Sequence, residues 1–267
     1  MLDRPIFIVG STNSGTKCLF HSLMGHPDIA GPEKELHFYG IGGNFDGRIN
    51  RLFSLWPNFN TNYLDNMGSP RSFGTGPTIG ANVEQVFERI FVNENIDPQG
   101  KRVLFKDPKL SLRIKWLKHI FPDCYIISII RNPWSTIEGI IRRLPVLGDV
   151  PLNLDIPTAT AQWHATNTII ELDSQKIDNF ITVRYEDMIA ADTFPGNTEG
   201  NCFWSRLLAH LGLSTNHFKI PNSSKYSHFD NTKNTLSLKN LSAWDVNYIS
   251  NACSTLINKY GYRLEEG

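Results

Sequence analysis

A glycine- and serine-rich stretch near the start of the chain, Gly10-Ser-Thr-Asn-Ser-Gly15, has the residue types that bind phosphate. It follows the apolar run Ile6–Val9 and precedes an apolar, helix-like segment that begins at Cys18. Consecutive backbone N–H groups point out of such a turn, and the positive end of the helix dipole lies behind them. The apolar run shows no alternation, which indicates a buried parallel strand. The stretch therefore predicts a phosphate-binding loop, the alternative being a turn that only caps a helix.

The amino-acid sequence of this loop differs from that of an ATP-binding Walker A loop. A Walker A loop has Gly, four residues, then Gly-Lys-Ser/Thr. Gly10 and Gly15 have that separation, but Thr16 stands where the lysine should be and Lys17 comes one residue late. In a tight phosphate-binding loop, this one-residue shift points the Lys17 ammonium in another direction. The loop therefore disfavours an ordinary nucleoside-triphosphate kinase.

Basic side chains come at the ends of later apolar runs. Lys106 ends one such run, and Arg131 and Arg184 follow two others. Because apolar runs alternate with helix-like segments along the whole chain, we expect an α/β fold with a central parallel sheet and helices on both faces. Ligands of such sheets bind beyond the C-terminal ends of the strands. The sequence thus predicts that the glycine loop and these cations share one edge, suited to a ligand with more than one phosphate-like group.

Composition narrows the classes of protein. The length of 267 residues fits a single domain, and 26 Lys+Arg against 26 Asp+Glu give a formal net charge of +0. That balance argues against a nucleic-acid partner. The four cysteines form no CxxC pair and no metal site is visible, while a Cys202–Cys253 pairing stays open. The first strand begins close to Met1 and no apolar run is long enough for a bilayer, so we expect a soluble, cytoplasmic protein without a membrane span.

Taken in order, the motifs resemble those of the sulfotransferases that use 3′-phosphoadenosine-5′-phosphosulfate (PAPS). The loop matches through Asn13-Ser-Gly-Thr16, and the helix after it ends in His26-Pro27. A later strand ends in Arg131-Asn-Pro133, another in Arg184-Tyr-Glu-Asp187, and a Leu211-Gly-Leu213 turn follows. The resemblance covers nearly the whole chain. It implies the P-loop-like sulfotransferase fold in one domain over residues 1–267, PAPS as donor, 3′,5′-adenosine bisphosphate as product, and no metal.

The resemblance also implies which residues hold the donor. In the family the loop holds the 5′-phosphosulfate, the arginine grips the 3′-phosphate, and the Tyr-Glu-Asp segment borders the adenine. Two positions depart from the family: Asn13 stands where Lys or Arg is usual, and Gly139 stands where a serine is usual. Either Ser135, one turn earlier on the same side, substitutes for that serine, or the 3′-phosphate is held less fully. The residues implied for the donor are Asn13, Ser14, Gly15, Thr16, Lys17, Arg131, Ser135, Gly139, Tyr185 and Lys225.

Two further segments resemble the glycan-modifying members. Glu35-Leu-His-Phe-Tyr39 is similar to the Glu-x-His-Phe-Phe segment whose glutamate is the general base, and Lys106-Asp-Pro108 to the Lys-x-Pro segment beside the transferring sulfuryl group. The resemblance therefore implies Glu35 and Lys106 as catalytic residues and a free hydroxyl, on a carbohydrate or glycoconjugate, as acceptor. Loops at 40–80 and 145–157 are expected on the substrate side. Implied acceptor residues are His37, Lys109, Arg143 and His164.

Three questions stay open at this level. Asn13 and Gly139 leave room for a nucleotide-binding relative that has lost catalysis, and a P-loop kinase of similar fold is a more distant alternative. The acceptor could equally be a polysaccharide, a glycolipid, a peptide tyrosine or a small metabolite. The oligomeric state is not encoded in any motif.

Overall fold

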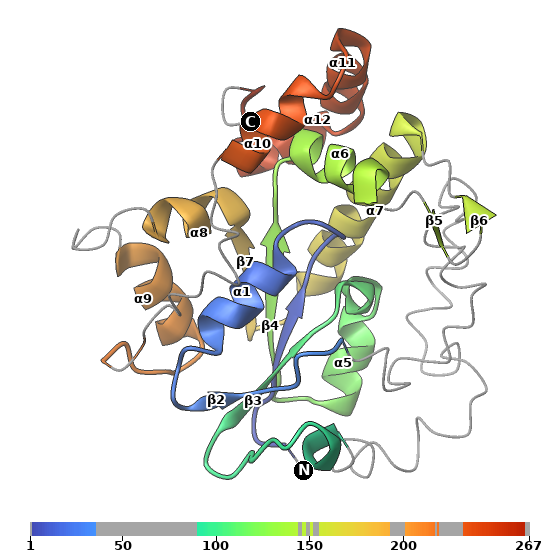
Figure 1. Ribbon diagram of the computed structural model, residues 1–267. Coiled ribbons are helices and arrows are strands. Elements are labelled where there is room, and N and C mark those ends of the chain that lie inside the picture. The colour runs from blue at the N-terminus through green and yellow to red at the C-terminus, as the bar shows by residue number, and fades with distance from the viewer. Residues whose placement is uncertain are drawn as a thin grey trace.

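A central sheet organises the chain (Figure 1). The computed structural model describes residues 2–35, 90–143, 146–147, 150–151, 155–192, 201–216, 218 and 232–264. Five strands lie in the order β2-β3-β1-β4-β7, and each neighbouring pair is parallel. This confirms the predicted single α/β domain with a parallel sheet. The strands are β1 (Ile6–Val9), β2 (Ile29–Ala30), β3 (Arg102–Lys106), β4 (Tyr125–Ile130) and β7 (Phe180–Arg184).

Helices cover both faces of the sheet, and a short antiparallel pair of strands, β5 (Val146–Leu147) and β6 (Val150–Pro151), lies apart from it (Figure 1). The helices are α1 (Thr16–Leu23), the 3₁₀ helix η4 (Pro108–Leu112), α5 (Ile114–Ile120), α6 (Pro133–Arg143), α7 (Ile156–Ser174), α8 (Tyr185–Asp192), α9 (Asn201–His210), α10 (Thr232–Lys239), α11 (Ala243–Ala252) and α12 (Ser254–Tyr260). No helix in these described ranges is both long and apolar enough to cross a membrane.

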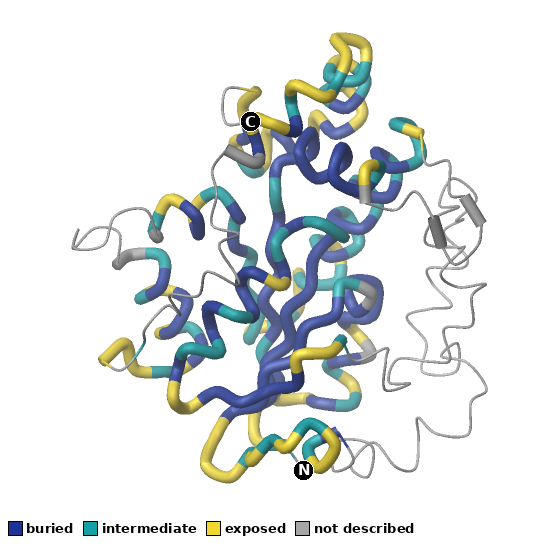
Figure 2. Tube along the Cα trace, in the orientation of Figure 1, coloured by how far each residue is buried: buried dark blue, intermediate teal, exposed yellow. Residues whose placement is uncertain are grey.

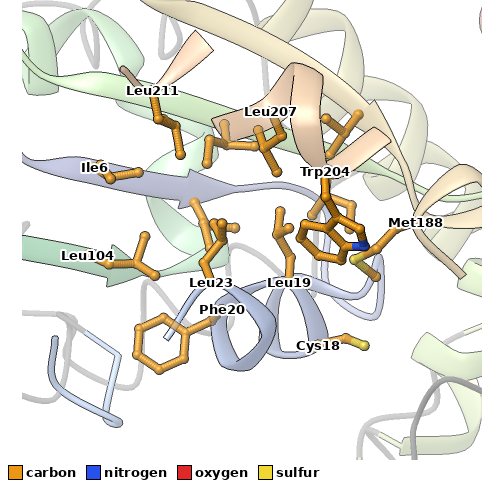
Figure 3. Packing of buried hydrophobic residues seen from close by; sticks show 14 of the residues in the cluster. Ile6, Cys18, Leu19, Phe20, Leu23, Leu104, Met188, Trp204, Leu207 and Leu211 are labelled. Carbon is orange, nitrogen blue, oxygen red and sulfur yellow. The ribbon is translucent and has the colours of Figure 1, made fainter. Parts of the chain in front are cut away.

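Strand β1 shows how the sheet divides the core, because its successive side chains point to opposite faces. Ile6 and Ile8 pack with residues of α1, α8 and α9 on one face (Figure 3). Phe7 and Val9 pack with residues of η4, α5 and α7 on the other. All four are fully buried (Figure 2). Burial on both faces explains why the run is continuously apolar, as expected of a parallel strand.

A third apolar cluster fixes the helices beyond the C-terminal end of the sheet. Trp134 of α6 and Trp163 of α7 are buried there with residues of α11 and α12. Cys253 belongs to the same cluster and is a free, buried thiol, so it forms no bridge with Cys202. Burial raises the pKa of the Cys253 thiol to about 12, which keeps it protonated and inert.

Several element boundaries differ from the sequence-based expectation. The apolar pattern over 110–121 predicts one helix, but the structure divides this segment into η4 and α5. The pattern over 242–260 also predicts one helix, which the structure divides at Cys253 into α11 and α12. The polar composition of residues 221–235 predicts a loop, but residues 232–235 begin α10. The 145–157 loop contains β5 and β6 and the first turn of α7, whereas the 40–80 loop lies outside the described residues.

Candidate active site

The predicted phosphate loop lies directly beyond β1, between the ends of its two neighbours. Ile8 is paired with Lys106 of β3, and Val9 with Ser128 of β4. Ser111 of η4 holds the first glycine: its Oγ accepts from the Gly10 N–H at 2.8 Å and donates to the Gly10 carbonyl at 3.0 Å. The loop is therefore anchored at its base by a side chain from the adjacent strand-to-helix connection.

The loop reaches α1 through Gly15, whose conformation only glycine adopts easily. Its φ is 99°, and a Cβ there would lie 2.4 Å from the Tyr185 ring. Gly15 is the N-cap of α1 and provides no side-chain cap. No capping side chain therefore competes with a ligand for the N–H groups of the first turn, which face the loop. Within the described residues, the buried hydroxyls of Ser11 and Ser14 have no hydrogen-bond partner. These donors fit an anionic ligand such as a phosphate ester.

Lys106 and Glu35, the predicted catalytic pair, are in direct contact. The Lys106 Nζ lies 2.5 Å from Glu35 Oε1. The lysine side chain is only 7% exposed, while the glutamate is 26% exposed and hence reachable from solvent. A charge-assisted contact from a buried ammonium to a partly exposed carboxylate is strong and fixes both groups. Strand β3 thus delivers Lys106 to the C-terminal edge of the sheet, where Glu35 meets it.

Arg131, at the end of β4, is held from three sides. Its Nε donates to Asn234 Oδ1 at 2.9 Å and its Nη2 to the same oxygen at 2.5 Å. Its Nη1 lies 3.4 Å from the Asn13 carbonyl of the loop, and its guanidinium stacks 4.6 Å from the centre of the Tyr185 ring. The predicted phosphate-binding arginine is therefore oriented by the loop, by α8 and by α10.

Neutral amides and one carboxylate continue this network. Asn132 donates from its backbone N–H and from Nδ2 to Glu186 Oε1, at 3.0 and 2.9 Å. Asn234 Nδ2 lies 3.4 Å from the same oxygen. Asn132 Oδ1 also accepts from the Ser135 N–H at 2.8 Å, and so caps the first turn of α6. Glu186 thus ties the end of β4 to the start of α10.

Gly139 and Ser135 lie on α6, facing the loop and α10 respectively. A Cβ at Gly139 would lie 3.6 Å from the Asn13 side chain, which is ordinary van der Waals distance. The glycine therefore leaves space beside Asn13, whose own backbone has a φ of 64°. Ser135 Oγ lies 3.4 Å from the Asn234 carbonyl. The structure brings both departures from the family pattern next to the predicted donor site.

Other predicted residues lie elsewhere or outside the description. Lys17 is exposed on the first turn of α1, and His164 is half-buried on α7, where burial lowers its pKa. The backbones of Lys109 and Arg143 lie in η4 and at the end of α6, and nothing further is described for the Lys109 side chain. His37 and Lys225 lie outside the described residues.

Arg184, counted among the strand-end cations, makes structural contacts. It lies 3.8 Å from Asp187 one turn along α8, and its guanidinium is 4.7 Å from the centre of the Tyr262 ring. This arginine therefore packs the C-terminal segment onto the end of β7. Of the strand-end cations predicted above, Lys106 and Arg131 lie at the ends of the two strands that flank β1 and its loop.

Sequence reasoning missed the residues that support these cations. Ser111 and Asn234 carry no motif of their own and were not predicted. Glu186 belongs to the Arg184-Tyr-Glu-Asp187 motif, but no role was predicted for it. Glu138 was missed too, although it accepts hydrogen bonds from Ser237 and Asn240, each at 2.9 Å. The one feature of the sequence that could have indicated these residues is their spacing. Ser135 and Glu138 are three residues apart, as are Asn234 and Ser237, so each pair shares a helix face.

The fold and these strand-end residues define an α/β protein with a candidate anion-binding loop, and sequence comparison identifies its family. Residues 5–193 match the profile of the Sulfotransferase family, so the chain belongs to that family. It is 28% identical over 186 residues to the omega-hydroxy-beta-dihydromenaquinone-9 sulfotransferase Stf3 of Mycobacterium tuberculosis (strain CDC 1551 / Oshkosh), with 64% of this chain and 44% of that protein covered. It is 26% identical over 188 residues to protein-tyrosine sulfotransferase A of Caenorhabditis elegans, with 69% and 45% covered.

The chain thus spans less than half the length of these curated relatives. Solved structures confirm the fold. The sulfotransferase domain of the Synechococcus PCC 7002 olefin synthase has a TM-score of 0.56 at 17% identity, covering 98% of this chain and 96% of that one. Sulfotransferase STF9 from Mycobacterium avium has a TM-score of 0.55 at 14% identity, covering 99% and 79%. The predicted family is therefore confirmed, but these relatives do not single out its glycan-modifying branch.

Proposed function

We propose that this protein transfers a sulfuryl group from PAPS to an acceptor hydroxyl. The observation that carries the proposal is the contact between Lys106 Nζ and Glu35 Oε1, because it joins a buried cation to a partly exposed carboxylate beside an anion-binding loop. A transfer site needs both groups: one to stabilise developing negative charge and one to take the proton of the acceptor. Family membership over residues 5–193 supports the same reaction.

The residues present fit the donor at both of its charged ends. The first turn of α1 and the buried hydroxyls of Ser11 and Ser14 suit a phosphosulfate group. Arg131 suits a 3′-phosphate, since a guanidinium fork matches phosphate geometry. The Arg131 guanidinium already donates to an oxygen, Asn234 Oδ1. Tyr185 stacks on the arginine and lies against Gly15. Bound PAPS would supply the activated sulfuryl group.

Glu35 and Lys106 would then act on the acceptor and on the developing charge. Glu35 would accept the proton of the acceptor hydroxyl at one of its carboxylate oxygens. Lys106 would give up its contact with Glu35 and stabilise the negative charge that develops on the leaving phosphate oxygen of the donor. The N–H groups of the loop would help to stabilise the same charge. Asn13 adds no charge at the loop position where the family resemblance implies Lys or Arg, so Lys106 would carry most of this electrostatic role.

We further propose a carbohydrate or glycoconjugate as the acceptor. This rests on the resemblance of Glu35-Leu-His-Phe-Tyr39 to the segment of glycan-modifying members, since residues 36–39 of that segment lie outside the described residues. The curated relatives are named for a hydroxylated menaquinone and for protein tyrosine, so an isoprenoid alcohol and a phenol are the competing acceptor classes.

Binding and transfer should be measured separately. Calorimetry with 3′,5′-adenosine bisphosphate and with ATP–Mg tests the donor site, and we expect binding of the bisphosphate alone. Tight ATP–Mg binding without bisphosphate binding would reject the proposal in favour of a kinase. Labelled PAPS with sugar, tyrosine-peptide and isoprenoid-alcohol acceptors then tests transfer. Bisphosphate binding with no labelled product on any acceptor would indicate a relative that has lost catalysis.

A further inference from the structure

The contacts of Arg131 raise the question of what keeps Asn234 in place. Asn234 Oδ1 accepts from both Nε and Nη2 of Arg131, and the asparagine is only 6% exposed. It comes from α10, which is distant in sequence from β4. The orientation of the arginine therefore depends on how α10 is docked.

Helix α10 packs against α6 (Figure 1). Ser135 Oγ lies 3.4 Å from the Asn234 carbonyl, near the N-terminal ends of both helices. One turn further, Glu138 Oε2 accepts from Ser237 Oγ at 2.9 Å. Just beyond α10, Asn240 Nδ2 donates to Glu138 Oε1 at 2.9 Å.

Glu138 is the only charged group in this set of hydrogen bonds between α6 and the α10 segment within the described residues. Its side chain is 7% exposed, and Arg142 one turn along α6 donates Nε to Glu138 Oε1 at 2.9 Å. A buried carboxylate that accepts three hydrogen bonds is strongly fixed in place. Two of those bonds come from the segment that carries Asn234.

We propose that Glu138 is a positioning residue for the nucleotide site: it clamps α10 onto α6, so that Asn234 holds the Arg131 guanidinium in the orientation that selects a 3′-phosphate. The proposal rests on the proposed function, because it assigns Arg131 to the donor. The hydrogen bonds of Glu138 go to Ser237, Asn240 and Arg142, so it acts on the arginine through the α10 segment.

The physical basis is preorganisation of a long side chain. A free arginine samples many rotamers, and ordering it on binding costs affinity. Asn234 fixes the Nε edge, while Tyr185 fixes the plane of the guanidinium. The Nη1–Nη2 end, whose Nη1 also lies 3.4 Å from the Asn13 carbonyl, is the edge of the guanidinium that matches a phosphate. Loosening α10 should therefore weaken recognition of the 3′-phosphate while leaving the rest of the nucleotide site intact.

The test compares two ligands that differ only in the 3′-phosphate. Calorimetry gives the two dissociation constants, and the constant for adenosine 5′-monophosphate divided by that for 3′,5′-adenosine bisphosphate measures 3′-phosphate selectivity. We expect Glu138→Gln, Ser237→Ala and Asn234→Ala each to lower this ratio about 3–10-fold, the effect of one lost hydrogen bond. The affinity for the monophosphate should change little.

A double-mutant cycle separates positioning from general destabilisation. If Glu138 acts through Asn234, the loss in Glu138→Gln/Asn234→Ala should be no larger than in Asn234→Ala alone. Glu171→Gln is the matched control, because Glu171 also joins two helices but contacts Lys259 of α12 instead. We expect Glu171→Gln to leave the ratio unchanged. Thermal unfolding of each variant verifies that it is folded.

Three results would overturn the inference. The first is an unchanged ratio in Glu138→Gln and Ser237→Ala alongside a wild type that prefers the bisphosphate. The second is a raised ratio in Asn234→Ala, since Asn234 would then compete with the phosphate. The third is full additivity in the cycle. A wild type with no preference for the bisphosphate would instead reject the proposed function, and the inference with it.

Discussion

The two cations at the loop are held in different ways. Lys106 contacts a formal charge directly, at 2.5 Å from Glu35 Oε1. Arg131 donates to two neutral oxygens, Asn234 Oδ1 and the Asn13 carbonyl, and stacks on the Tyr185 ring. One cation is therefore paired with a potential catalytic group, whereas the other is oriented by an amide and an aromatic face.

This difference separates a site for chemistry from a site for binding. A lysine carries a point charge on a flexible side chain. An acidic partner holds that charge in position, and the lysine can leave this partner to stabilise negative charge that develops during the reaction. An arginine that must bind a phosphate needs a fixed plane, which an amide and a ring provide. We therefore expect the Lys106 region to affect the rate and the Arg131 region to affect affinity.

The largest expected effect is on the catalytic rate. Lys106→Ala and Glu35→Gln should each lower kcat by about 10²–10³-fold, because each removes a group that acts on charge in the transition state. Steady-state kinetics with labelled PAPS measures this. Affinity for 3′,5′-adenosine bisphosphate should change much less, while Arg131→Ala should lower that affinity about 10–100-fold.

Lys34→Ala is the matched control for Lys106→Ala. Lys34 is adjacent to Glu35 in sequence and forms a 2.9 Å ion pair with Glu94, but its side chain is 62% exposed. Exposed pairs contribute little, so kcat should not change. Full activity in Lys106→Ala, or a loss of bisphosphate binding as large as that in Arg131→Ala, would remove the distinction between the two regions.

A second prediction concerns the two glycines that border Asn13 and Tyr185. Gly15→Ala should destabilise the protein by roughly 1–3 kcal/mol, because φ is 99° and the new Cβ would lie 2.4 Å from the Tyr185 ring. Gly139→Ala should be neutral or stabilise by up to about 1 kcal/mol, since the nearest atoms are 3.6 Å away and the position is helical. Urea unfolding measures both, and equal stabilities would contradict the requirement for glycine at position 15 of the loop.

The sequence predicts the sheet and its C-terminal edge because those features depend on local patterns. Continuous apolar runs identify β1, β3 and β4, and the residue after each run must lie at the same edge, which brings Lys106 to the loop and Arg131 beside it. The resemblance implies a role for Glu35 and a role for Lys106, but it does not predict that the two form an ion pair.

The supporting network was not predictable, since it depends on tertiary packing. Asn234 lies where a polar loop was expected, and nothing in its neighbours distinguishes it from a solvated asparagine. Its helix α10 is amphipathic only weakly and gains its place from contacts with α6. Strand β2 was missed because two residues, Ile29 and Ala30, are too short a run to show any period.

The smallest expected effect comes from the pH dependence of Glu138. Burial by itself would raise the pKa of this carboxyl, but the hydrogen bonds from Asn240, Arg142 and Ser237 outweigh burial and lower the pKa below its ordinary value of 4.5. A lowered pKa in the folded state means that the charged form stabilises the fold, and that this contribution is lost as pH falls through the folded pKa.

The difference in free energy of unfolding between wild type and Glu138→Gln should therefore be constant from pH 7 to about pH 5 and shrink at lower pH, below the ordinary pKa of a glutamate. Urea unfolding over this range at fixed ionic strength measures it. A difference that grows on acidification would mean that the carboxylate destabilises the fold rather than docking α10. The Arg131 region would then owe its order to Tyr185 and the loop, and the contrast with Lys106 would no longer involve α10.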